Sequence, residues 1–122
     1  IFTFDKTIKM NFSTDQIRNV TFVTSNVEKL DASNAPELKS HFILLNNAGI
    51  NNIILDLSSS KYCDSSGLSA ILTGNRLCKD TNGQFVICGL QANVQKMIEI
   101  AQLDRVFKIC GTVDEAQAAI EF

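Results

Sequence analysis

The sequence NIILDLSSSKYCDSSGLSAIL, residues 52–72, contains the signals for a strand, a polar loop and a helix in direct succession. Its first part is almost wholly apolar and has the length of a strand that is buried on both faces of a sheet. Leu68, Ile71 and Leu72 then fall at helical spacing, and the segment between them and the strand is rich in serine. A strand followed by a loop and a helix is the repeating unit of parallel α/β folds, so this stretch predicts the fold class.

Asp64, Ser65, Ser66 and Gly67 occupy the expected start of that helix. Aspartate and serine are favoured N-cap residues, and the free N–H groups of a first helical turn favour negative charge. A serine hydroxyl held there can be phosphorylated with a modest electrostatic penalty. On spacing alone, a purely structural helix start is the commoner explanation. In that interpretation Asp64 or Ser65 caps the helix, Ser66 fills its first turn and Gly67 allows close packing against the sheet.

The composition is that of a single globular domain. The 122 residues are 45% hydrophobic and 20% charged, which argues against a disordered chain. The net charge of −2, without a basic block, argues against a nucleic-acid partner. We expect the domain to span residues 11–122. Residues 1–10 are then an N-terminal extension or a remnant of expression, because Met10 is a possible natural start.

The cysteines predict buried, reduced thiols rather than a metal site. Cys63, Cys78, Cys88 and Cys110 have no C-x-x-C spacing, and His41 is the single histidine. Three of the cysteines lie within or beside apolar runs, which favours burial in a reducing compartment. No signal peptide or membrane span is visible in the sequence, so we expect a cytoplasmic protein without a membrane partner. We expect His41 to be exposed to solvent.

The flanking segments predict further strands and helices. Hydrophobic periodicity and turn residues indicate the following elements: strands at 11–17 and 20–25 that turn around 18–19, a helix that opens at 33–37 and ends at 46–49, a strand at 84–88, a helix at 92–102, a strand at 105–109 and a helix that opens at 112–115. Asn34 with Glu37, and Thr112 with Glu115, fit the capping-box pattern. Phe2 and Phe4 fit an additional edge strand.

This order predicts an α/β fold with a mixed, mostly parallel sheet, an N-terminal antiparallel hairpin and about four helices. Functional residues of such folds lie at the carboxyl ends of the strands, where the serine-rich loop falls. The chain has no G-x-G-x-x-G, no G-K-[ST] and no G-x-S-x-G motif. Paired carboxylates are not concentrated in any one loop. We therefore expect no enzymatic activity and no cofactor.

Residues 53–58 and 63–72 together resemble the signature of STAS domains, in particular the bacterial anti-sigma factor antagonists. Three weaker similarities occur in the same order as in that family: Leu30-Asp31-Ala32, the segment from Gly83 to Gly89, and Leu103-Asp104-Arg105-Val106-Phe107. The resemblance extends over residues 11–122. Before the Leu-Asp pair the family commonly has Gly-Glu, whereas this chain has Glu28-Lys29, and the reversed charge at Lys29 bears on which partner docks.

The resemblance implies a phosphorylation switch at Ser65. In that family the serine after the motif aspartate is phosphorylated by an anti-sigma factor that is also a serine kinase. The unphosphorylated antagonist binds that partner and frees the sigma factor; a serine phosphatase is a further possible partner. The partner-binding residues implied for this chain are Asp31, Asp64, Ser65, Ser66, Gly67 and Ser69. A phosphate adds about −1.5 to −2 charges, and we expect it to form a negative patch with Asp64 and Asp56.

Two other functions are compatible with the sequence. One is a STAS module outside sigma pathways, such as an accessory subunit of a lipid-transport complex or a stress-signalling scaffold. The Asp64-Ser65-Ser66 sequence favours a phosphorylated anti-sigma factor antagonist over such a module, because a module without a kinase has no need of an exposed serine there. The other is a small domain that binds a phosphate or nucleotide ligand through residues 58–60, although solvated loop serines are the simpler interpretation.

Overall fold

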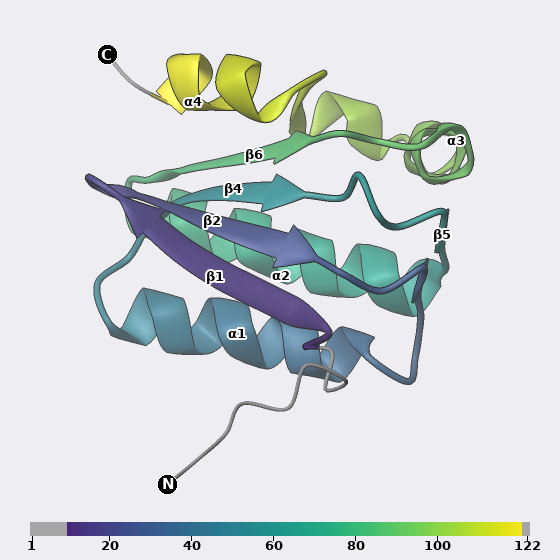
Figure 1. Ribbon diagram of the computed structural model, residues 1–122, viewed down its shortest axis with the longest axis horizontal. Helices are drawn as coiled ribbons and strands as arrows, with labels where there is room; N and C mark the ends of the chain where they lie inside the picture. Colours follow the sequence, from purple (N-terminus) through teal and green to yellow (C-terminus); the bar gives the residue numbers. More distant parts are fainter. Residues whose placement is uncertain (1–9, 121–122) are drawn as a thin grey trace, which may run out of the picture.

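The computed structural model describes residues 10–120, which form a mixed five-stranded sheet with helices on both faces (Figure 1). The sheet has the order β1-β2-β4-β6-β7. Its strands are β1 (Phe12–Ile17), β2 (Val20–Ser25), β4 (Asn52–Asp56), β6 (Gln84–Cys88) and β7 (Lys108–Cys110). The helices are α1 (Ala35–Asn47), α2 (Ser65–Asp80), α3 (Ala92–Ile100) and α4 (Val113–Ile120). Helices α1 and α2 cover one face of the sheet and α4 covers the other (Figure 1).

The sheet confirms the predicted fold class. Strands β1 and β2 pair antiparallel, and every other neighbouring pair in this sheet is parallel. The hairpin turns at residues 18–19, where Arg18 takes a positive φ of 58°. The possible edge strand at Phe2 and Phe4 lies outside the described residues.

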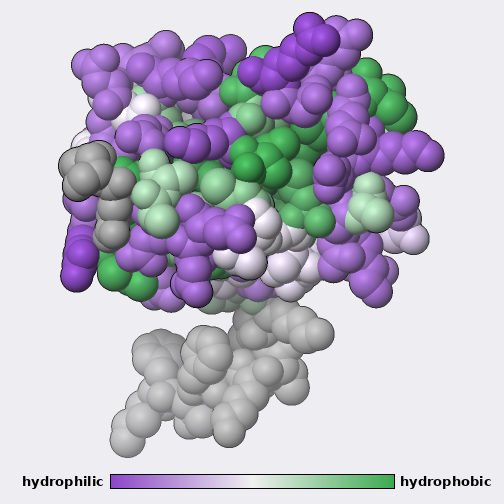
Figure 2. Space-filling view, turned by 90° about the horizontal axis from the view of Figure 1, so that it is seen from above, coloured by the Kyte–Doolittle hydropathy of each residue, from purple (hydrophilic) through white to green (hydrophobic). Residues whose placement is uncertain are grey.

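Two apolar clusters form the core, one on each face of the sheet. The larger cluster fills the space between the sheet and the pair α1 and α2, and includes Leu38, Phe42 and Ile71. The smaller cluster lies under α4 and includes Ile54, Val86 and Ile120. From the α4 side the surface is mainly hydrophilic, with some apolar side chains visible near its middle (Figure 2). The faces of α1, α2 and α4 that carry the apolar periodicity are thus the faces that pack on the sheet.

A second, two-stranded parallel ladder, formed by β3 (Lys29–Leu30) and β5 (Tyr62–Cys63), has no counterpart in the predicted elements. Near the C-terminus two boundaries differ from the prediction. The strand predicted at 105–109 is β7 at Lys108–Cys110, and Arg105 belongs to the 3-10 helix η1 (Leu103–Arg105). The predicted helix 92–102 ends at Ile100, and Ala101 is exposed.

The predicted capping box of α1 is wrong, although Asn34 is the N-cap residue. The Asn34 side chain makes no capping hydrogen bond. Its Oδ1 accepts from the N–H of Asp31 at 3.0 Å and its Nδ2 donates to the carbonyl of Lys29 at 2.8 Å. In α4 the predicted capping hydrogen bond is present, since Thr112 Oγ1 accepts from the N–H of Glu115 at 3.1 Å.

His41 is less exposed than expected. Its side chain has a relative exposure of 31% and lies 3.8 Å from the Glu37 carboxylate. Its ring also meets the edge of Phe12, with the two centroids 5.9 Å apart. The ring of His41, on α1, therefore packs against Phe12 of β1.

Candidate functional site

Asp64 caps α2 and places Ser65 at its first position. The backbone of Asp64 is extended (φ −100°, ψ −172°), and its Oδ1 accepts from the N–H of Gly67 at 3.0 Å. The Asp64 carbonyl accepts from the N–H of Leu68 at 3.0 Å, which closes the first turn. Ser65 is exposed and Ser66 half-buried. The structure thus has an exposed hydroxyl where the helix dipole and the first free N–H groups favour negative charge.

The β3–β5 ladder fixes the position of this helix start. Leu30 pairs with Cys63, and the N–H of Asp64 donates to the Leu30 carbonyl at 3.1 Å. Gly67 packs against the ladder so closely that a Cβ atom there would lie 2.6 Å from both the Leu30 carbonyl oxygen and Cys63 Sγ. The short ladder therefore brings Asp31 and Asp64, each directly after one of its strands, to the same end of the molecule.

Asp31 is held as a carboxylate by its own loop. Its Oδ1 accepts from Ser33 Oγ at 2.6 Å and from the Ser33 N–H at 3.0 Å. These hydrogen bonds from Ser33, with a smaller contribution from the charge of Lys29, lower the pKa of Asp31 below its ordinary value. Because hydrogen bonds to the charged form stabilise it, Asp31 carries its negative charge at neutral pH.

Two depressions flank the start of α2. The first, here called the α1–α2 groove, has a volume of about 580 Å³; it is lined by Ala32, Ala35, Pro36, Lys39, Ser40, Ile43, Ser65, Ser66 and Ser69. The second, here called the α3 groove, has a volume of about 870 Å³; it is lined by Glu28, Lys29, Leu30, Asp31, Tyr62, Cys63, Asp64, Asn93, Lys96, Met97 and Ile100. Asp64 lines one depression and the adjacent Ser65 lines the other.

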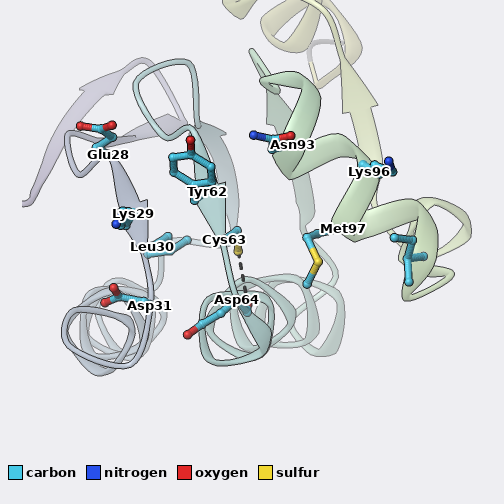
Figure 3. A pocket seen from close by; sticks show the side chains of 11 residues that line it. Glu28, Lys29, Leu30, Asp31, Tyr62, Cys63, Asp64, Asn93, Lys96 and Met97 are labelled. Atoms are coloured by element: carbon cyan, nitrogen blue, oxygen red, sulfur yellow. Dashed lines mark hydrogen bonds between the residues drawn. The ribbon is translucent and has the colours of Figure 1, made fainter.

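Figure 3 shows the two walls of the α3 groove. The ladder side carries Lys29 and Tyr62, and the α3 side carries Asn93 and Met97. Asp31 and Asp64 lie together at the end of the groove that is next to α1 and α2 (Figure 3).

The structure brings most of the sequence-predicted site residues together. Asp31 and Asp64 share the α3 groove, and Ser65, Ser66 and Ser69 share the α1–α2 groove. Gly67 is buried, so it shapes the helix start but offers no surface to a partner. We therefore leave Gly67 out of the contact surface proposed below.

Asp56 does not lie where the expected negative patch requires it. Its Oδ1 accepts from the N–H of Ser58 at 3.0 Å, and its carboxylate lies beside Gly89. Asp56 lines neither of the two grooves. The carboxylate that accompanies Asp64 is Asp31.

The serines of residues 58–60 do not form a phosphate cradle. Ser60 is fully buried; its Oγ lies 2.8 Å from Ser25 Oγ and donates to the Val27 carbonyl at 2.7 Å. The Ser58 carbonyl accepts from Gln91 Nε2 at 2.7 Å. These contacts tie the loop to β2 and α3, which is a structural role.

The cysteines are unpaired thiols in the part of the chain that the structure describes. Cys63, Cys78 and Cys88 are buried, and Cys110 is partly exposed. Burial raises the pKa of each of the three buried thiols to about 12. Since the thiolate is the reactive form, these three side chains are poor nucleophiles.

Residues 10–120 contain no cluster of three or more metal-ligating side chains of the His, Cys, Asp or Glu type. None of the helices in this range is long and apolar enough to cross a membrane.

Sequence reasoning missed most of the residues that line the grooves, among them Lys39, Tyr62, Met97 and Ile100. A signal existed for Lys39, which follows Ala35 by four residues and so lies on the same side of α1. Met97 lies in the predicted helix 92–102 and is only partly buried. Tyr62 and Ile100 line the same groove only because the unpredicted ladder faces α3 (Figure 3).

Comparison with known proteins agrees with this arrangement. A model of the STAS domain family matches residues 11–116. BtrV of Bordetella bronchiseptica, a candidate anti-sigma factor antagonist, is 25% identical over 92 residues, which cover 75% of this chain and 79% of that protein. The crystal structure of a candidate antagonist from Thermotoga maritima has a TM-score of 0.83 at 28% identity, covering 89% of this chain and 93% of that one.

The Bacillus cell-fate determinant SpoIIAA, solved in its phosphorylated form, has the same fold: its TM-score is 0.70 at 17% identity, with 90% of this chain and 99% of that chain covered. Because the family model extends over most of the chain, this protein belongs to the STAS domain family.

Proposed function

We propose that this protein is an anti-sigma factor antagonist that binds its partner around Ser65 and loses it when Ser65 is phosphorylated. The observation that carries the proposal is the exposed hydroxyl of Ser65 at the capped first position of α2, in a chain of the STAS family. The names of the relatives BtrV and SpoIIAA support it, since the first is a candidate antagonist and the second has been solved in phosphorylated form.

The site suits a switch that acts on binding rather than on folding. A phosphate on Ser65 would stand at a helix N-terminus, where negative charge is favoured, and Lys39 lines the same groove. The fold therefore accommodates the modification. A partner fitted to the neutral hydroxyl must instead accommodate about two extra negative charges next to Asp64. Weakening a complex tenfold to a hundredfold requires only about 1.4 to 2.8 kcal/mol, which one misplaced charge at an interface can supply.

The test is phosphorylation by an ATP-binding anti-sigma factor from the same organism. We expect the intact mass to rise by one phosphoryl group, and peptide mapping to place that group on Ser65. Ser65→Ala should remain folded, bind the partner and take up no phosphate. Ser66→Ala and Ser69→Ala, two serines of the same groove, are matched controls that should still take up one phosphoryl group, mapped to Ser65. Unchanged phosphate uptake by Ser65→Ala would refute the assignment.

Binding should respond to charge at the same position. Isothermal titration in the presence of ADP measures the affinity without phosphate transfer. We expect Ser65→Asp to weaken binding at least tenfold and Ser65→Ala to leave it within about threefold of wild type. Equal affinity of the Asp and Ala variants would contradict the proposed switch.

A further inference from the structure

The α3 groove combines exposed apolar side chains with two carboxylates, Asp31 and Asp64, that accept hydrogen bonds from their own loops but form no ion pair among residues 10–120. Ile100 and Tyr62 have relative exposures of 69% and 48%, although both are large and apolar in their greater part. Met97 is partly buried between them and the core. Concave surfaces with apolar walls and a few polar groups are typical of binding sites.

The charges of the α3 groove are uneven along its length. Asp31 and Asp64 lie together at the end next to α2 (Figure 3). Asp31 is held ionised by Ser33, and neither carboxylate takes part in an ion pair among residues 10–120. Lys29 lies over the ring of Tyr62, with Nζ 5.9 Å from the ring centroid. The end of the groove nearest to Ser65 is therefore its acidic end.

A partner that holds the Ser65 hydroxyl has to cover more than the α1–α2 groove. A specific complex buries about 800 Å² on each partner, from about 20 to 30 residues. The α1–α2 groove is lined by nine residues, so a stable interface must extend past it. The α3 groove begins at Asp64, the neighbour of Ser65, and presents the exposed apolar side chains of Tyr62 and Ile100.

We propose that the α3 groove is a second docking site for the same anti-sigma factor. Its occupant is a segment of that partner that places an apolar side chain against Tyr62, Met97 and Ile100 and a basic side chain between Asp31 and Asp64. The inference rests on the function proposed above and specifies how the partner is selected. An arginine suits the acidic end best, because its planar guanidinium can serve two carboxylates at once.

Charge variants at Ile100 test both parts of the inference. Ile100→Lys and Ile100→Asp both remove the apolar contact, but only the lysine also repels a basic side chain of the partner. With the anti-sigma factor and ADP in isothermal titration, we expect Ile100→Lys to weaken binding at least tenfold, or about 1.4 kcal/mol. Ile100→Asp should weaken binding by a smaller factor. Because Ile100 is exposed at the end of α3, both variants should melt close to the wild-type temperature.

Leu44→Lys is the matched control. Leu44 is also an aliphatic residue on a helix, with a relative exposure of 66%, and it lines neither groove. Its variant should bind within twofold of wild type. A loss of affinity for Leu44→Lys equal to that for Ile100→Lys would show a general effect of added charge and overturn the inference.

The outcomes separate this inference from the proposed function. If the wild type binds the anti-sigma factor and the Ile100 variants bind equally well, the groove is not a docking site and the proposed function stands. If Ile100→Asp weakens binding more than Ile100→Lys, the assigned basic side chain is wrong. If the wild type binds no anti-sigma factor, both proposals fail. A homodimer of the protein alone that Ile100→Lys dissociates, measured by light scattering, would assign the groove to a second copy instead.

Discussion

Replacement of Asp64 should separate its role as a helix cap from its role as a charge. Alanine removes the side chain that accepts the Gly67 N–H at 3.0 Å, and loss of an N-cap costs about 1 kcal/mol. Asparagine keeps an acceptor of the same length and is an equally good N-cap. The entropy of unfolding is about 2.1 cal/mol/K per residue, or about 0.26 kcal/mol/K for the 122 residues of this chain. Asp64→Ala should therefore lower the Tm by about 4 °C, and Asp64→Asn by much less.

Calorimetry and urea unfolding of both variants measure this difference. Asp104→Ala, which removes an exposed acidic residue of η1, is the control for the loss of one negative charge. A Tm of Asp64→Asn as low as that of Asp64→Ala would mean that the charge, rather than the capping hydrogen bond, stabilises the start of α2. Because Asp64→Asn retains the helix start, it is also the variant that tests whether the partner needs the negative charge.

Three other substitutions test the surroundings of the site. Ser60→Ala removes the hydrogen-bond partner of the buried Ser25 hydroxyl and of the part-buried Val27 carbonyl, and should cost about 1 to 3 kcal/mol in urea unfolding. Ser59→Ala, at an exposed position, should be neutral, and equal effects would contradict the structural role of Ser60. Gly67→Ala should destabilise the folded protein by about 1 to 3 kcal/mol, because the new Cβ would lie 2.6 Å from the backbone oxygen of Leu30. This cost should exceed the gain from the better helix propensity of alanine, and a variant more stable than the wild type would refute the close packing. Burial raises the pKa of Cys78 in the folded state to about 12, so the folded state keeps this proton when the unfolded state loses it. The free energy of unfolding should therefore fall as pH rises from about 9 towards 12. In chemical denaturation Cys78→Ala should show a shallower fall with pH, and an identical dependence on pH would argue against a protonated buried thiol.

The main elements of the fold could be predicted from periodicity, because each packs an apolar stripe on the sheet. Strand β4 (Asn52–Asp56) and the helix that begins after Asp64 are examples, and the N-terminal hairpin is another. Residue type offered Asp64 or Ser65 as the N-cap, and in the structure it is Asp64, whose side chain reaches the Gly67 N–H within the same turn. Local signals of this kind depend on neighbours in the sequence.

The elements that were missed depend on contacts between distant residues. Strands β3 and β5 have two residues each, which is too short for alternation to be visible, and they exist because residues 28–31 and 61–64 meet in space. Asn34 has a good capping residue type, but its amide serves Asp31 and Lys29 instead. The α3 groove follows from the same missed ladder, so its apolar residues carried no functional signal in the sequence.

The position of Ser65 explains why a switch at this site would act on the surface. The residues around it that hold the fold are Asp64, which caps, and Gly67, which packs against the ladder, whereas the exposed Ser65 side chain accepts and donates no hydrogen bond in the described structure. A modification of its hydroxyl therefore breaks no native contact. The ladder that anchors the helix start also forms one wall of the α3 groove, so the serine and that groove are fixed relative to each other. A partner that engages both would meet them on one continuous surface, so a charge added at Ser65 would lie directly beside the contacts made in the groove.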